Sequence, residues 1–179
     1  VWRVGEPLHL LWRPLYPAVI AVTEWCGAHQ VWGHKLLSSL AMIGGVVCVW
    51  GSLRAKLRGA GASVWVVAGL VGLWVAIHPM MVHVGHATLT EPWFCLLAWA
   101  ALWVGVGARR SWHIVLTGVL AGFAALTRGT GIPLGCALIL SPPFVAGLGG
   151  LRRRLYVGLP FVALAAPWTH VRCSEHCRP

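Results

Sequence analysis

The sequence predicts an all-α protein, a polytopic transmembrane helical bundle of about six spans. Three observations predict it. Of the 179 residues 58% are hydrophobic and 10% are charged, whereas soluble domains carry about 25% charged residues. The apolar residues form runs that short basic clusters separate. The twelve tryptophans are typical of the interfacial belts of membrane proteins, and the mean hydropathy of +0.76 agrees.

We expect one membrane domain in three parts. Residues 1–31 are interrupted by charges, proline and glycine, and are expected to form an external loop with an interfacial segment at 15–22. Residues 171–179 are expected to be a tail. The expected spans within 32–170 are 32–52, 63–77, 89–109, 112–127, 132–148 and 155–168. Several are shorter than the roughly 20 residues that a span needs, so tilted neighbours, local thinning or borrowed flanking residues must supply the difference.

The basic clusters orient these spans. Clusters at 54–58 and 109–110, and a third at 152–154 just before the last span, fall in alternate loops. Because cytoplasmic loops carry an excess of lysine and arginine, we place the clusters in the cytoplasm. The N-terminal loop, the segment 78–91, the turn at Arg128 and the tail then share the external face.

The net charge of +10 raises the question of nucleic-acid binding, since a basic patch is the footprint of phosphate recognition. Here the basic residues lie between apolar runs, which is the pattern of membrane topology. We therefore expect the lipid bilayer as a partner and no nucleic acid.

Glu91 is one of four acidic residues in a chain without aspartate, and it precedes Pro92 at the start of an expected span. This order favours an N-terminal helix position. The helix dipole stabilises a carboxylate there, which is one explanation of Glu91. The other is that ionisable groups at a membrane boundary often mark substrate or ion paths. Position alone favours neither.

Three histidines lie in the segment 78–90, just before Glu91. His83 and His86 are three residues apart, which suits one helical face, and with His78 they are candidates to bind a metal. The alternative, which we favour, is that they hydrogen-bond water and backbone at the interface.

The six cysteines form no CxxC pair. Cys173 and Cys177, with His170 and His176, resemble a metal-ligand cluster near the end of the chain. Without a second CxxC-type half, the pattern is a weak indication of a metal site.

Arg128 stands apart from the basic clusters, between an apolar run and Gly-Thr-Gly at 129–131. An arginine at a membrane face suits bidentate phosphate recognition. It is equally explained by a side chain that reaches lipid headgroups. Arg13, between Trp12 and Pro14, has the same two explanations.

Four short motifs occur in an order that resembles a known family. They are Pro-Leu-Tyr-Pro at 14–17, Leu-Thr-Glu-Pro-Trp-Phe at 89–94, Leu-Ala-Gly-Phe-Ala-Ala-Leu-Thr-Arg at 120–128 and Ala-Pro-Trp-Thr at 166–169. The set resembles the polyprenyl-phosphate-dependent glycosyltransferases of the GT-C superfamily, such as protein O-mannosyltransferases and aminoarabinose transferases.

The resemblance implies a GT-C-like membrane domain in a multi-pass protein of the bacterial inner (plasma) membrane. It implies transfer of a sugar from a polyprenyl-phosphate donor to an acceptor on the external face. It makes Glu91 a candidate catalytic residue that faces the sugar or acceptor. Candidate substrate-binding residues are Arg13, Tyr16, Arg128 and His86. Assistance by a divalent metal differs between branches of the family and is left open.

The chain departs from the family in two respects. The family's catalytic acid, usually an aspartate of the first external loop, precedes the Pro-Leu-Tyr-Pro element, and this chain has no aspartate. After Ala-Pro-Trp-Thr an Arg-Asn-like element is usual, whereas His170 follows here. We therefore expect a fragment whose catalytic acid lies upstream of Val1, inactive in isolation.

Two other classes remain open. The chain can be part of a transporter in which an intramembrane glutamate and histidines relay protons. The gathering of polar residues at one face and the lack of a broken-helix repeat speak against this. A structural membrane subunit, whose polar turns only satisfy backbone groups, is the third interpretation.

Overall fold

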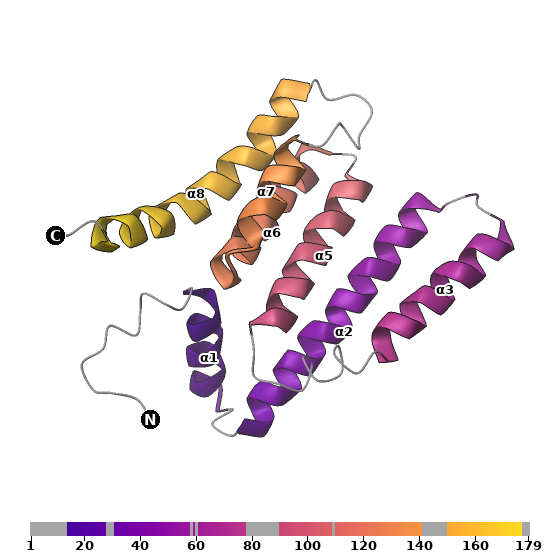
Figure 1. The fold of residues 1–179 in the computed structure, drawn as a ribbon, viewed down its shortest axis with the longest axis horizontal. Helices are drawn as coiled ribbons and strands as arrows, with labels where there is room; N and C mark the ends of the chain where they lie inside the picture. The colour runs from indigo at the N-terminus through magenta and orange to yellow at the C-terminus, as the bar shows by residue number, and fades with distance from the viewer. Residues whose placement is uncertain are drawn as a thin grey trace.

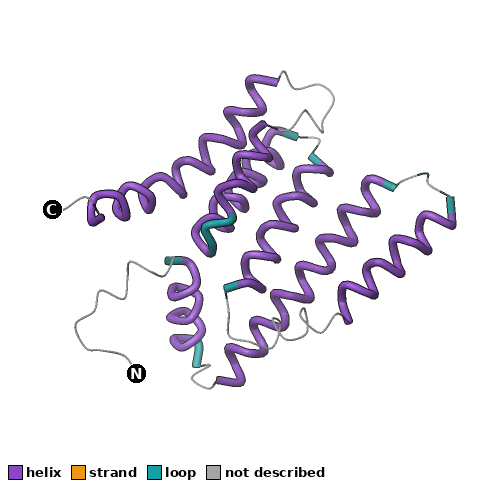
Figure 2. Tube along the Cα trace, in the orientation of Figure 1, coloured by secondary structure: helices purple, strands orange, loops and turns teal. Residues whose placement is uncertain are grey.

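The computed structural model describes residues 14–27, 31–57, 59, 61–77, 90–108, 110–140 and 150–176. In this part of the chain there are seven helices and no strand (Figures 1 and 2). The helices are α1 (Leu15–Trp25), α2 (Val31–Lys56), α3 (Ala62–Ile77), α5 (Glu91–Gly107), α6 (Ser111–Thr127), α7 (Gly131–Leu140) and α8 (Gly150–His176). The all-α prediction is confirmed.

Six of these helices fall on the six expected spans, and α1 falls on the expected interfacial segment. The last helix differs most. Helix α8 begins at Gly150, so Arg152 and Arg154 belong to it, and the expectation that this cluster precedes the helix is wrong. It also continues through the expected tail to His176, with Pro160 and Pro167 in its interior. The last part of the fifth expected span, 141–148, lies outside the described residues.

Helix length does not support the expectation of six spans. Among the described residues, one helical stretch is long and apolar enough to cross a membrane, Trp32–Arg54 of α2. Helices α5 and α6 have 17 residues each, and at about 1.5 Å per residue such a helix extends roughly 25 Å. The hydrocarbon core of a bilayer is about 30 Å thick. The multi-pass topology is therefore not supported by the described helices.

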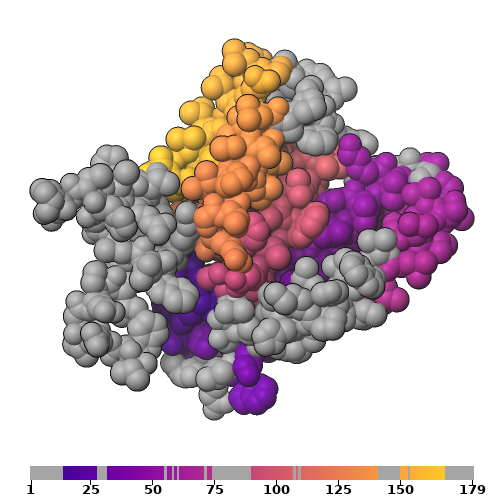
Figure 3. All heavy atoms as spheres, in the orientation of Figure 1, coloured from indigo at the N-terminus to yellow at the C-terminus, as the bar shows by residue number. Residues whose placement is uncertain are grey.

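Four helices form the main layer of the bundle. Helix α5 packs against α2 on one side and against α6 on the other, and α6 packs against α8. The short α7 contacts both α6 and α8, whereas α3 lies at the edge of the molecule beside α2 (Figures 1 and 3). Helix α1 contacts α6 and α2. Figure 1 shows α1 near the end of the bundle where α5 begins and α6 ends.

The core consists mainly of small residues, and large apolar side chains face outward. Ala101, Ala121 and Ala124 have no exposed surface, whereas Trp25 is 88% exposed and Leu151 is 74% exposed. Water-soluble domains bury their large apolar side chains preferentially. In this bundle small residues are buried and many large apolar side chains are exposed, which is the opposite distribution.

Two glycines bring α6 and α8 into close contact. Gly118 lies so near α8 that an added Cβ would overlap the backbone carbonyl of Val157. One turn later, a Cβ on Gly122 would lie 2.8 Å from the Leu164 side chain. Such a Gly-x-x-x-Gly pattern lets helix backbones approach closely, as it does between transmembrane helices. The pattern fixes α6 against α8.

Candidate functional site

An ion pair joins the beginning of α5 to the end of α6. The Nη1 atom of Arg128 donates a hydrogen bond of 2.7 Å to Oε1 of Glu91, across 37 residues of sequence. Helices α5 and α6 are antiparallel neighbours, so the first residue of α5 and the residue that follows α6 lie at the same end of the bundle (Figure 1). We call it the Glu91 end.

The local sequence holds Glu91 at the helix terminus. Glu91 is the first residue of α5, as expected from the proline that follows it. Pro92 is fully buried, and it fits an initial helical position because its missing N–H has no partner to lose there. The partial positive charge of the helix N-terminus favours the carboxylate. The position of Glu91 is therefore determined by local chemistry.

Arg128 is held through the backbone on both of its sides. Its N–H donates to the Ala124 carbonyl at 3.1 Å, and its carbonyl accepts from Gly131 at 2.9 Å. Thr127, which is buried, donates its hydroxyl to the Ala124 carbonyl at 2.6 Å. Arg128 itself has left the helix and has an extended backbone, with φ −148° and ψ 144°. The side chain can therefore turn toward α5 from an anchored main chain.

The two charged side chains lie at the boundary between the bundle and its surroundings. The Arg128 side chain is 46% exposed and that of Glu91 is 29% exposed. The second carboxylate oxygen of Glu91, Oε2, is buried and has no hydrogen-bond partner among the described residues. An unsatisfied buried acceptor costs about 1–3 kcal/mol. Oε2 is thus suited to accept a hydrogen bond from a ligand hydroxyl, beside a guanidinium with further donors.

Of the other predicted site residues, Tyr16 is described, whereas Arg13 and His86 are not. Tyr16 is on α1, the helix that packs against α6, and is 8% exposed. Arg13 and His86 lie outside the described residues, as do His78 and His83. The structure thus brings Glu91 and Arg128 together, and leaves the predicted roles of Arg13 and His86 without a described geometry.

Among the described residues, no three His, Cys, Asp or Glu side chains gather in a way that could hold a metal ion. Of the cluster predicted near the end of the chain, Cys177 is outside the described residues, and the side chains of His170, Cys173 and His176 are not described.

The sequence did not point to a contact that ties α1 to α2. Thr23 of α1 donates its hydroxyl to the Ile20 carbonyl at 2.8 Å. Its oxygen lies 3.3 Å from Nδ1 of His34 on α2. Since the hydroxyl proton is already used, His34 is the donor in this contact. No motif marks this pair, because the two residues come from different helices with no shared spacing.

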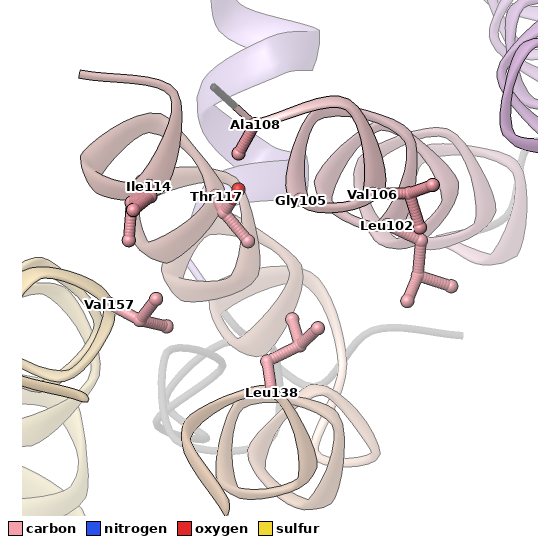
Figure 4. Close-up of a pocket in the computed structure, with 8 residues that line it drawn as sticks. All are labelled: Leu102, Gly105, Val106, Ala108, Ile114, Thr117, Leu138 and Val157. Carbon is pink, nitrogen blue, oxygen red and sulfur yellow. The ribbon is translucent and has the colours of Figure 1, made fainter. Parts of the chain in front are cut away.

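A small cavity lies away from the ion pair, between α5, α6, α7 and α8 (Figure 4). Its volume of about 10 Å³ accommodates about one water molecule. The lining residues are Leu102, Gly105, Val106, Ala108, Ile114, Thr117, Leu138 and Val157. Most of them are apolar, and the Thr117 hydroxyl donates to the His113 carbonyl at 2.9 Å. The cavity is too small for a sugar or a phosphate.

No protein-family model, no curated protein and no solved structure matches this chain.

Proposed function

We propose that this chain is part of an integral-membrane glycosyltransferase of the GT-C type, which transfers a sugar from a polyprenyl-phosphate donor to an acceptor on the external face. The observation that carries the proposal is the Glu91–Arg128 pair. It combines a half-exposed guanidinium with a carboxylate oxygen that has no partner among the described residues. Both residues belong to the motifs that resemble this family.

The inverted distribution of side chains supports a membrane location. Alanine and glycine fill the contacts between helices, whereas tryptophan, leucine and valine face outward on α2, α3 and α8. Lipid tails solvate such a surface and water does not. In this proposal α2 crosses the bilayer, and the shorter helices cross it with the help of local thinning or flanking residues. The Glu91 end is external and the basic clusters are cytoplasmic.

Arg128 is proposed to bind the phosphate of the lipid-linked donor. A guanidinium presents five N–H donors in a planar fork that matches phosphate oxygens. Glu91 engages the Nη1 end of this fork, and the 46% exposure of the side chain leaves room for a phosphate. When the bond between sugar and phosphate breaks, negative charge develops on the phosphate, and a nearby arginine stabilises it.

Glu91 is proposed to face the sugar or the acceptor. Its Oε2 atom can accept a hydrogen bond from a hydroxyl, and a general base must reach the acceptor hydroxyl directly or through one water. In the family the catalytic acid is usually an aspartate, and this chain has none. We therefore propose that the chain supplies donor binding, that the catalytic acid comes from another segment, and that these 179 residues alone transfer no sugar.

The test is sugar transfer in proteoliposomes, with the gene expressed together with its native flanking sequence and a radiolabelled polyprenyl-phosphate sugar as donor. A charge-assisted hydrogen bond is worth about 1.5–3 kcal/mol, so Arg128→Ala is expected to lower the transfer rate about 10- to 100-fold. Arg128→Lys should retain an intermediate rate, because it keeps the charge and loses the fork. Glu91→Gln should also lower transfer.

Arg54→Gln is the control, since Arg54 lies in the last turn of α2 at the other end of the bundle. It should transfer at the unmodified rate. Unchanged transfer by folded Arg128→Ala and Glu91→Gln proteins would remove both residues from the site. The transporter alternative predicts another result in the same vesicles: a proton-coupled solute flux that Glu91→Gln abolishes, without sugar transfer.

A further inference from the structure

The end of the bundle opposite the Glu91 end gathers basic side chains from three places in the sequence. Arg54 and Lys56 end α2, Arg110 precedes α6, and Arg152 and Arg154 lie in the first turns of α8. Figure 1 shows the C-terminal end of α2 and the beginnings of α6 and α8 at the same end of the bundle. We call these five residues the basic end.

We propose that the basic end binds the headgroups of anionic phospholipids in the cytoplasmic leaflet. This inference rests on the membrane location in the proposed function, and it is independent of sugar transfer. All five side chains are exposed. Juxtamembrane basic residues attract an anionic leaflet, with about 1 kcal/mol, or roughly a fivefold gain in binding, for each lysine or arginine near the surface.

The acidic residues of the described helices lie away from the basic end. The described helices hold three glutamates, Glu24, Glu91 and Glu175, and none of them lies at the basic end. Glu91 begins α5, and Glu24 is near the end of α1, the helix beside the beginning of α2. Among the described residues, no salt bridge involves Arg54, Arg110, Arg152 or Arg154. An anionic partner is therefore the complementary one.

Two helix N-termini reinforce the positive potential. The contacts of Gly118 with Val157 and of Gly122 with Leu164 run in the same order along both helices. Helices α6 and α8 are therefore parallel, and both begin at the basic end (Figure 1). Each N-terminus carries a partial positive charge of about half an elementary charge. Arg110 and Arg152 flank these termini, where phosphate oxygens are favoured.

Exposed apolar and aromatic side chains identify the partner as a lipid surface and not a free anion. Trp112 is 55% exposed, Leu151 is 74% exposed and Tyr156 is 38% exposed, each within four residues of an arginine of the basic end. Tryptophan and tyrosine are enriched where hydrocarbon meets headgroup. A leaflet of anionic lipid supplies both the negative charge and the apolar layer that these side chains require.

The experiment measures which lipids stay with the protein. The chain is reconstituted in vesicles of nine parts phosphatidylcholine to one part phosphatidylglycerol, extracted in mild detergent and analysed for retained lipid by mass spectrometry. We expect phosphatidylglycerol to be enriched over its bulk ratio by at least about fivefold. Arg110→Gln with Arg152→Gln and Arg154→Gln should reduce the enrichment nearly to the bulk ratio. Lysine at all three positions should keep most of it.

Lys35→Gln is the control for net charge, because Lys35 is in the first turns of α2, at the opposite end, with its ammonium 5.1 Å from the Trp32 ring centroid. It should leave the enrichment unchanged. Enrichment that persists in the triple glutamine protein, or that Lys35→Gln reduces as much as Arg152→Gln does, overturns the proposal.

Alkaline extraction of the same vesicles separates the lipid-binding proposal from the proposed membrane location. A chain released from the membrane overturns the membrane location, whereas a retained chain without enrichment overturns only the lipid site.

Discussion

Helices α6 and α3 are alike in composition and differ in what surrounds them. Both are apolar, with 17 and 16 residues, and both carry two glycines on one face. In α6 eight residues are buried, and Gly118 and Gly122 meet α8. In α3 the glycines Gly69 and Gly72 have no neighbouring atoms within 4 Å of an added Cβ. Apolar composition therefore does not determine burial, which depends on whether a partner helix lies opposite the small residues.

The largest effect is expected at Gly118. Gly118→Ala places a methyl group against the backbone carbonyl of Val157, and a backbone cannot move aside as a side-chain end can. Overpacking of this kind costs typically 1–3 kcal/mol. We expect unfolding in detergent, followed by circular dichroism against denaturant, to give a free energy lower by about 2 kcal/mol. A Gly118→Ala protein as stable as the parent would contradict the close packing of α6 on α8.

A smaller loss is expected at Gly135 of α7, where an added Cβ would overlap the ring of Phe161 on α8. Because the ring can shift, Gly135→Ala should lower the free energy of unfolding by about 1 kcal/mol. In the background of Phe161→Leu the same change should cost less, with a coupling of at least about 0.5 kcal/mol. Additive losses in the double-mutant cycle would mean that the two residues do not meet.

On α3 a glycine-to-alanine substitution should change the free energy of unfolding in the opposite direction. An alanine at Gly69 or Gly72 meets no neighbour, and alanine is favoured over glycine inside a helix by about 0.8–1 kcal/mol. Gly69→Ala is therefore expected to leave stability unchanged or to raise it by up to about 1 kcal/mol. The measurement is the same as for Gly118→Ala, which makes the two substitutions a matched pair. A loss at Gly69 as large as that at Gly118 would show that α3 has a packed face.

The Glu91–Arg128 pair should contribute least to stability. With side chains 29% and 46% exposed, the pair resembles surface ion pairs, which contribute about 0–1 kcal/mol. A double-mutant cycle with Glu91→Gln and Arg128→Gln should give a coupling below about 1 kcal/mol. A coupling of several kcal/mol would assign the pair to the stability of the fold, which would weaken the case for a binding role.

Much of the secondary structure was predictable because its signals are local. The apolar runs, with basic clusters and proline between them, located the six described helices from residue 31 onward, and the order Glu91-Pro92 located the start of α5. The beginning of α8 was not predictable in this way, because the charged run at 152–154 resembles a loop in the sequence and belongs to the helix in the structure. Charged residues at a helix start do not end the helix, and exposed arginines are tolerated there.

Of the candidate site, the sequence indicated that Glu91 and Arg128 share one face, but not that they touch. Their contact depends on α5 and α6 being antiparallel neighbours, so that residues 37 apart meet. The Thr23–His34 hydrogen bond depends in the same way on how α1 lies against α2. Neither distance follows from spacing along one helix.

The sequence by itself determined that this protein is helical, where most helices lie, and that charge separates into a basic end and the Glu91 end. Tertiary structure alone decided which helices pack together and which glycines are covered. The physical reason is that these helices are apolar on nearly all sides, so no polar face marks the direction of the core. A glycine indicates the direction of the core only where a partner helix packs on it. Val157 packs on Gly118 in this way, whereas no described atom packs on Gly69.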